Sequence, residues 1–186
     1  MTLDTGRVDT VTFDSFSTLV DLDSTAEAVE GYVDDPVQFA RRWHSRAAKY
    51  GMVANYTDTY RSYYDLHQDA LEYLLATEDV AISESRLEAM TSIYHDMEPF
   101  DDVRPCMEAL RDAGYEVGIV TNGNPEMIDS LLDVTDVRDL VSISVSAHEV
   151  RQYKPSSEIY EHAAERLDSS PSGIVHVSNG QYDVQG

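Results

Sequence analysis

The sequence predicts an α/β protein in which a parallel sheet carries a large helical insertion. Four segments rich in β-branched residues end in turn residues, as strands do, and they cover residues 8–14, 115–122, 140–146 and 173–179. Helical patterns of about ten to twenty-five residues separate the last three segments, which is typical of right-handed crossovers between parallel strands. Residues 19–102 have no strand signal, so we expect helices inserted after the first strand.

The helices of the insertion can be placed by their start signals. Asp35 and Pro36 form an N-cap and first-turn pair, which predicts that a helix begins there. Apolar side chains recur at helical spacing along residues 60–74, and a third helix is expected to begin near Ser83. After the insertion, Gly114 marks the end of a helix that leads into the second strand.

The chain is strongly acidic. Its 186 residues include 35 acidic and 13 basic side chains, for a formal net charge of −22, and only Lys49 and Lys154 are lysines. Concentrated salt screens such self-repulsion, so we expect a halophilic, cytoplasmic protein. The same charge argues against nucleic-acid and anionic-membrane partners, which need clustered lysine and arginine. No apolar run reaches the length of about 18 residues that would predict a membrane helix.

Polar side chains follow three of the four predicted strands. They are Asp14 and Thr18, Thr121 and Asn122, and Ser178 and Asp183. Lys154 precedes Pro155, which keeps the lysine out of the following helix and holds it beyond the third strand. Because ligands of open parallel sheets bind outside the carboxyl ends of the strands, we expect these groups to face one crevice.

Each of these residues has an ordinary structural explanation when it is taken singly. An aspartate after a strand is more often a helix cap, a Thr-Asn-Gly sequence is more often a turn, and a lysine is usually solvated. Their joint position at one edge of the predicted sheet favours a functional site.

Four motifs, in this order, resemble those of the haloacid dehalogenase superfamily. They read FDSFSTL, VTNGNPEMI, YKPSSEIYEHAAERL and IVHVSNGQYD. The resemblance covers nearly the whole chain and implies a Rossmann-like core, residues 1–18 and 103–186, with strand order 3-2-1-4 and a helical cap, residues 19–102. A fifth strand is expected to be missing, because the chain stops three residues after Asp183, and strand four then becomes an exposed edge.

Two positions favour the L-2-haloacid dehalogenase branch of this superfamily. Its phosphatases have an aspartate two residues after the nucleophile, where this chain has Phe16. Their acidic pair in the fourth motif corresponds here to Asn179 and Asp183, so magnesium, which prefers carboxylates, loses a ligand. The resemblance therefore implies a reaction without a metal or other cofactor. If the chain is a phosphatase instead, Asp14 and Asp183 are the expected Mg²⁺ ligands.

The resemblance also implies a role for each motif residue. Asp14 attacks the halogen-bearing carbon of a small carboxylate substrate and forms an aspartyl ester, which water opens. Lys154 keeps Asp14 ionised, Thr18 orients Asp14, and Ser178 with Asp183 tethers Lys154 or the hydrolytic water. The expected substrate-binding residues are Phe16, His44, Tyr63, Thr121, Asn122 and Tyr182. For Tyr63, ordinary core packing is an equally good explanation.

Two residues depart from the dehalogenase pattern. In that branch an arginine follows the tryptophan of the first cap helix and accepts the halide, and alignment on Trp43 places His44 there. A histidine is charged only below a pKa of about 6.5. Gly180 stands where the branch has an asparagine that positions water.

Three functions are thus open from the sequence. The first is a metal-independent hydrolase that resembles (S)-2-haloacid dehalogenase. The second is a Mg²⁺-dependent phosphatase that acts on a small phosphomonoester, and the third is a catalytically weak or inactive binding protein of the same fold. A homodimer is expected in the first case, because dimers are common in that branch.

Overall fold

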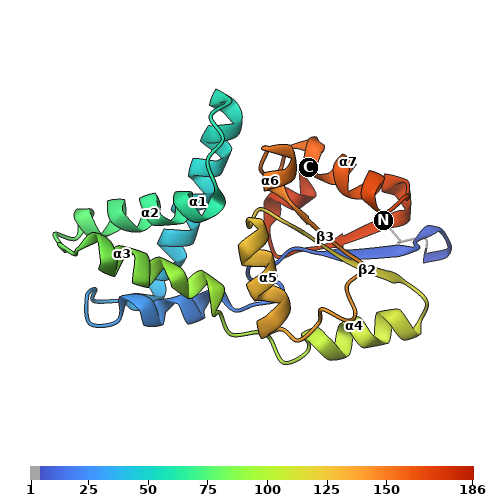
Figure 1. Cartoon of the computed structure of the whole chain (residues 1–186), viewed down its shortest axis with the longest axis horizontal. Coiled ribbons are helices and arrows are strands. Elements are labelled where there is room, and N and C mark those ends of the chain that lie inside the picture. The colour runs from blue at the N-terminus through green and yellow to red at the C-terminus, as the bar shows by residue number, and fades with distance from the viewer. Residues whose placement is uncertain (1–4) are drawn as a thin grey trace.

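The computed structural model describes residues 5–186, so residues 1–4 of the predicted core lie outside the described part. Four parallel strands form one sheet in the order β3-β2-β1-β4, which confirms the predicted fold class and strand order (Figure 1). The strands and α-helices are β1 (Thr10–Phe13), α1 (Pro36–Thr57), α2 (Tyr63–Thr77), α3 (Glu84–Thr91), α4 (Val103–Asp112), β2 (Glu116–Thr121), α5 (Pro125–Val134), β3 (Ile143–Ser146), α6 (Ala147–Val150), α7 (Ser157–Arg166) and β4 (Ile174–Val177).

The strands are shorter than predicted: β1, β2 and β4 end before the site side chains that follow them, and β3 begins at Ile143 instead of residue 140. All four residues of β1 are buried, and β1 pairs with β2 on one side and with β4 on the other. Asp14 lies one residue beyond β1, although its backbone N–H still donates to the carbonyl of Val177 at 2.9 Å. Helices α4 and α7 lie on opposite sides of the sheet, so its strands are covered on both faces (Figure 1).

The inserted helices α1, α2 and α3 stand beside the sheet, at the left of Figure 1. The Asp35 side chain accepts the N–H of Gln38 and caps α1, as predicted. Ser83 likewise caps α3. The second helix begins at Tyr63 rather than near residue 60, because the hydroxyl of Ser62 caps it. The sequence reading also missed the 3-10 helix Leu22–Val29, which precedes α1.

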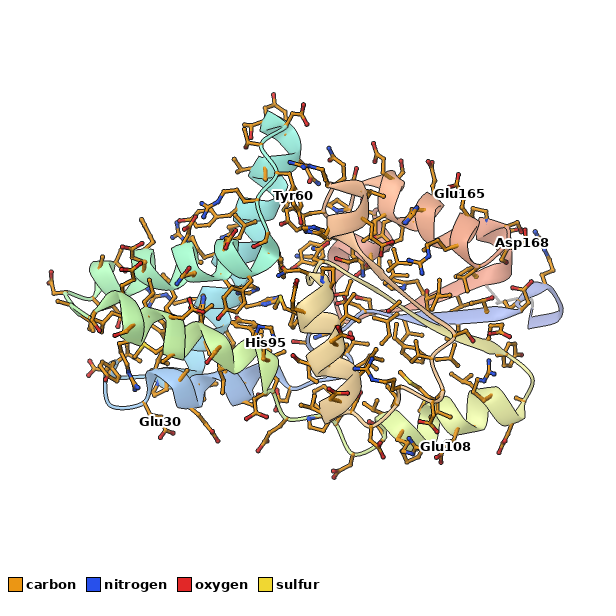
Figure 2. All side chains as sticks on the ribbon, in the orientation of Figure 1. Glu30, Tyr60, His95, Glu108, Glu165 and Asp168 are labelled. Atoms are coloured by element: carbon orange, nitrogen blue, oxygen red, sulfur yellow. The ribbon has the colours of Figure 1, made fainter. Side chains whose placement is uncertain are left out.

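The inserted segment is joined to the core where it leaves and re-enters it. Asp21 N–H donates to the carbonyl of Glu98 at 2.7 Å, and Phe100 N–H donates to the carbonyl of Leu19 at 3.1 Å. His95, which Figure 2 shows between the inserted helices and α5, also contacts the hydroxyl of Ser130 through its Nδ1 atom at 2.9 Å. These contacts hold the inserted helices over the carboxyl end of the sheet.

Acidic side chains cover the outside of the molecule. Figure 2 shows Glu30, Glu108, Glu165 and Asp168 at its periphery. Arginines are shared between acids, as Arg138 is between Asp129 at 3.2 Å and Asp133 at 2.9 Å. No helix within residues 5–186 has both the length and the apolar character that a bilayer crossing requires.

We expect the protein to lose stability when salt is diluted from about 1 M to about 0.1 M, because the Debye length grows from about 3 Å to about 10 Å. Repulsion among the surplus carboxylates then acts over a longer distance in the compact state. Urea unfolding, followed by the fluorescence of Trp43, the single tryptophan, measures this effect. NaCl and KCl should protect equally if screening is the cause. An unfolding midpoint that does not change with salt would contradict the charge argument.

Candidate active site

Asp14 lies where the chain turns away from an interior strand of the sheet. The turn is closed by the N–H of Leu19, which donates to the carbonyl of Ser15 at 2.8 Å, and Ser17 within it has a φ of 57°. The Asp14 side chain is 14% exposed, so it is largely enclosed but still accessible from the crevice. Such a carboxylate can meet a small molecule at the edge of the sheet.

Lys154 is held next to Asp14 by the loop that precedes α7. Its backbone N–H donates to the Asn122 side-chain oxygen at 2.9 Å. The adjacent Tyr153 is fixed to α1, since its N–H donates to Asn55 Oδ1 at 2.8 Å and its carbonyl accepts from Asn55 Nδ2 at 2.6 Å. The Lys154 side chain is only 2% exposed. Its ammonium therefore depends on protein groups for partners.

The Lys154 ammonium lies between two carboxylates. Its Nζ is 3.1 Å from Asp14 Oδ1 and 2.9 Å from Asp183 Oδ1. Asp183 also accepts hydrogen bonds from Tyr160 at 2.6 Å and from Ser178 at 2.6 Å. Asp14, Lys154, Asp183 and Ser178, taken from three separate motifs, are thus gathered in one cluster.

Asp183 is held in its charged form. Burial by itself raises the pKa of its carboxyl, but contacts with His176 and Lys154, together with the hydroxyls of Ser178 and Tyr160, outweigh burial and bring the pKa well below its usual value. A permanently charged Asp183 gives the buried ammonium a fixed counter-ion. Ser178 therefore acts on Lys154 through Asp183 and not directly.

The structure corrects the expected contact of Thr18. We expected its hydroxyl to orient Asp14, but this hydroxyl accepts the backbone N–H of Asn179 at 3.1 Å. Within the described residues, no hydrogen bond joins Thr18 to the Asp14 side chain. Thr18 thus ties the loop after β1 to the loop after β4, and it affects Asp14 only by fixing these two loops.

Thr121 and Asn122 are used to hold loops together. The Thr121 hydroxyl is 2.5 Å from the Ser15 hydroxyl and accepts the N–H of Gly123 at 3.1 Å. Asn122 fixes Lys154 through its oxygen. Both residues lie at the carboxyl end of β2, as expected. The side-chain oxygens of Thr121 and Asn122 already have protein partners. A substrate carboxylate that binds at this point would therefore accept hydrogen bonds from amide N–H groups.

Aromatic residues enclose the crevice beside Asp14. The Phe16 ring lies 5.6 Å from the His44 ring, 5.9 Å from Tyr63 and 5.8 Å from Tyr94, measured between centroids. Burial and the negative charges of Asp14 and Asp183 raise the pKa of the Tyr182 hydroxyl, so this residue lies near the same carboxylates. Phe16 and Tyr63 are thus in contact with one another, and the substrate-binding role of Phe16, Tyr63 and Tyr182 stays a prediction.

Several polar atoms of the aromatic residues around Phe16 have no partner. His44 Nδ1, both ring nitrogens of His67 and the Tyr94 hydroxyl are buried without a hydrogen bond in the structure. Burial lowers the pKa of His44 to about 4, although the charge of Asp14 opposes the effect, and burial lowers the pKa of His67 well below its usual value. Both imidazoles are therefore neutral at pH 7. An unpaired buried polar group costs about 1–3 kcal/mol, so this arrangement favours a polar guest.

Sequence reasoning missed His67, Tyr94 and His176. Each falls on an apolar pattern of a helix or strand, where a core side chain is expected. The one available signal was the spacing of Tyr63 and His67, because residues four apart share a helix face.

The sequence pattern of the family described as haloacid dehalogenase-like hydrolase matches residues 8–186. The chain belongs to the haloacid dehalogenase-like hydrolases. It is 27% identical to (S)-2-haloacid dehalogenase 4A of Burkholderia cepacia, over 94% of this chain and 76% of that protein. It is 26% identical to haloacetate dehalogenase H-2 of Moraxella sp. (strain B), over 97% of this chain and 81% of that protein.

Solved structures agree with this assignment. The L-2-haloacid dehalogenase of Xanthobacter autotrophicus, solved with chloropropionic acid covalently bound, superposes with a TM-score of 0.89 at 26% identity. The match covers 95% of this chain and 72% of that one. The family, the fold and the hydrolase class of this chain therefore rest on independent comparisons of sequence and of structure.

The site of this haloacid dehalogenase-like hydrolase does not fit a magnesium ion. Mg²⁺ requires several oxygen ligands around one point, and carboxylates are the strongest of them. Here the ammonium of Lys154 already lies between Asp14 and Asp183. Within residues 5–186, no group of three or more His, Cys, Asp or Glu side chains is arranged to hold a metal.

Proposed function

We propose that this chain removes halide from a small (S)-2-haloacid through an aspartyl ester, without a metal. The observation that carries the proposal is the position of Lys154, whose ammonium lies against Asp14 and Asp183 while Phe16 stands two residues after the nucleophile. A positive charge beside a partly enclosed carboxylate keeps Asp14 ionised and ready to attack.

The first step is a substitution at carbon. Asp14 Oδ1 is held by Lys154, which leaves Oδ2 to attack C2 of the substrate. The bond between C2 and the halogen breaks as the new C–O bond forms, and the halide departs with the bonding electron pair. The negative charge thus moves from Asp14 to the halide, and the aromatic wall at Phe16 excludes water from this step.

The second step is hydrolysis of the ester. Water adds to the carbonyl carbon of Asp14, the bond from this carbon to the substrate oxygen breaks, and a 2-hydroxy acid, a proton and the Asp14 carboxylate result. Asp183 is ionised and lies beside Asp14, so it is the group best placed to orient the water. At Gly180 an added Cβ atom would come within 3.1 Å of Asp183 and 3.2 Å of Ser178. Glycine therefore keeps this space open.

His44 faces the departing halide in this proposal. Its pKa of about 4 makes it neutral at pH 7, so its ring can offer the halide only an N–H group where the dehalogenase branch has a guanidinium. His67, with a ring 5.5 Å from that of His44, adds a second neutral imidazole. We infer that halide departure is slow in this chain and that it is helped by hydrogen bonds instead of by a full positive charge.

Halide release from L-2-chloropropionate, measured in about 1 M salt, tests the proposal. We expect wild-type protein to release chloride and Asp14→Asn to reduce the rate by at least about 10³-fold. Asp34→Asn, at an exposed position, is the matched control and should behave as wild type. A single turnover in oxygen-18 water should place the label on Asp14, because water attacks its carbonyl carbon.

Three results would overturn the proposal. Chloride release that survives Asp14→Asn would remove Asp14 as the nucleophile. Absence of chloride release, with Mg²⁺-dependent hydrolysis of p-nitrophenyl phosphate, would establish the phosphatase. Loss of both activities in a folded protein would favour the binding protein of the same fold.

Replacement of His44 by arginine should speed the first step. A guanidinium keeps its charge at neutral pH and can pair with the departing halide, whereas neutral His44 cannot. We expect His44→Arg to release chloride at least about tenfold faster than wild type under the same conditions. Arg42→His, on the exposed side of α1, is the control for changed surface charge. A rate unchanged by His44→Arg would mean that His44 does not face the halide.

We further propose a salt-rich cytoplasm as the location of the protein and a homodimer as its assembly. The first follows from the surplus of acidic residues, and the second from the dehalogenases that the chain resembles. Sedimentation equilibrium in about 1 M salt would decide between monomer and dimer.

A further inference from the structure

His176 provides the third partner of the catalytic ammonium. A lysine ammonium carries three hydrogens and accepts none. Two of them point to Asp14 and Asp183, and the third reaches His176, whose Nε2 atom lies 3.0 Å from Lys154 Nζ. Lys154 is almost fully buried, so these three groups, with the Tyr160 ring centroid 6.0 Å from Nζ, surround its charge.

The rest of the imidazole is fixed by the sheet. His176 belongs to β4 and lies directly opposite Thr12 of β1 in the strand register. Its Nδ1 atom is 2.9 Å from the Thr12 hydroxyl. A neutral imidazole has one N–H and one free electron pair. Nε2 lies 3.0 Å from the ammonium, which can only donate, and 3.2 Å from Asp183 Oδ1, which can only accept. The ammonium is the nearer of the two and already donates to Asp183 Oδ1, which favours the electron pair on Nε2 and the proton on Nδ1, where it is donated to Thr12.

We propose that His176 is a positioning residue, which holds Lys154 against Asp14 only while its imidazole is neutral and thereby makes the site sensitive to acid. The proposal rests on the proposed function, since Lys154 matters through its pairing with the nucleophile.

Protonation of His176 reverses its contact with Lys154. The new N–H on Nε2 points at the ammonium, and two positive charges then stand 3.0 Å apart. The imidazolium instead donates to Asp183 Oδ1, which is 3.2 Å from Nε2, and so competes with Lys154 for its counter-ion. The Tyr160 ring, 6.0 Å away between centroids, is a further titratable neighbour, and its hydroxyl donates to Asp183.

A purely structural role for His176 leads to a different expected result. If His176 only packed and bonded with Thr12, its removal would lower stability without changing how activity depends on pH. The positioning role instead predicts that kcat/KM falls on acidification and that this fall is absent when residue 176 cannot be protonated. His44, with its pKa of about 4, and Asp183, whose pKa is lowered well below its usual value, change charge below pH 5.

Two variants of His176 separate these possibilities. His176→Gln keeps an oxygen that can accept from Lys154 but does not titrate, and His176→Leu removes the acceptor. For the wild type we expect kcat/KM for L-2-chloropropionate to fall from pH 8 to pH 5. His176→Leu should lower kcat by at least about tenfold at pH 8 with little change in KM. His176→Gln should recover most of this loss and show no acid limb in the same range. An acid limb that persists in His176→Gln would overturn the proposal, even if the leucine variant fails to fold.

The tautomer of His176 can be read without any turnover. Long-range nitrogen-15 NMR of the wild-type histidines at pH 8 should show His176 with its proton on Nδ1. A proton on Nε2, or a protonated ring at pH 8, would overturn the proposal. Because this measurement needs no substrate, it stands apart from the chloride-release assay. A chain that releases no chloride but shows the Nδ1–H tautomer would refute the proposed function and leave the arrangement of Lys154 and His176 intact.

Discussion

Replacement of Lys154 by methionine is expected to lower the free energy of unfolding by about 3–5 kcal/mol and to abolish halide release. The ammonium is 2% exposed and separates Asp14 from Asp183, whose side chains are 14% and 4% exposed. Methionine fills a similar volume but leaves two carboxylates facing each other without a cation. Asp14 and Asp183 each lose a cationic partner in a site that water reaches poorly, which costs free energy. Repulsion between the two carboxylates adds to this cost.

Urea unfolding at pH 7 in about 1 M salt measures this loss. Lys49→Met, which removes the other lysine of the chain from the exposed face of α1, is the matched control and should leave stability unchanged. Lys154→Met combined with Asp183→Asn should be more stable than Lys154→Met alone, because one uncompensated charge is removed. If Lys154→Met unfolds at the wild-type urea concentration, the ammonium is not the partner that the two carboxylates need.

The catalytic cluster could be predicted from sequence because each member follows a strand or stands before a proline. The sheet topology then brings these residues together. Parallel crossovers place β1 and β4 side by side, so Asp14 and Asp183 lie close in space although they are far apart in the chain. Lys154 reaches them because Pro155 and Asn122 hold its backbone outside the next helix. Local rules of this kind can be read from single residues.

The contacts of Thr18, His67 and His176 could not be predicted in the same way. Thr18 is four residues from Asp14, but its hydroxyl faces the loop after β4, a direction set by the turn at Ser17. His176 occupies a strand position where either core packing or a polar contact is compatible with the sequence. Which one occurs depends on the exact placement of Lys154, and this is a property of the folded sheet.

A wall of unpartnered imidazoles beside a nucleophile has an energetic consequence. In the folded protein His44 and His67 are held neutral by burial, whereas in the unfolded chain they bind protons like any histidine. The stability of the folded protein is therefore sensitive to acid through His44 and His67, the residues that we place beside the leaving halide.

Acidification from pH 7 to pH 4 should therefore destabilise the wild type more than the His44→Leu variant. Above pH 6.5 neither state binds a proton at His44, so this residue gives no pH dependence. Between pH 6.5 and about 4 only the unfolded chain binds the proton, because the pKa falls from 6.5 to about 4 on folding, and stability drops as the pH drops. A difference of about 2.5 in pKa corresponds to about 3 kcal/mol, an upper limit since part of the ring is accessible from the crevice.

The free energy of unfolding, measured with urea at intervals from pH 7 to pH 4, gives the slope for each variant. His44→Leu should lose less stability than the wild type over this range, and His44→Leu with His67→Leu should lose less still, because His67 contributes in the same direction. His162→Gln, which changes a histidine paired with Glu149 outside the site, is the control. Equal slopes for the wild type and His44→Leu would mean that His44 binds a proton as readily in the folded protein as in the unfolded chain. The inference that His44 is neutral beside the leaving halide would then be wrong.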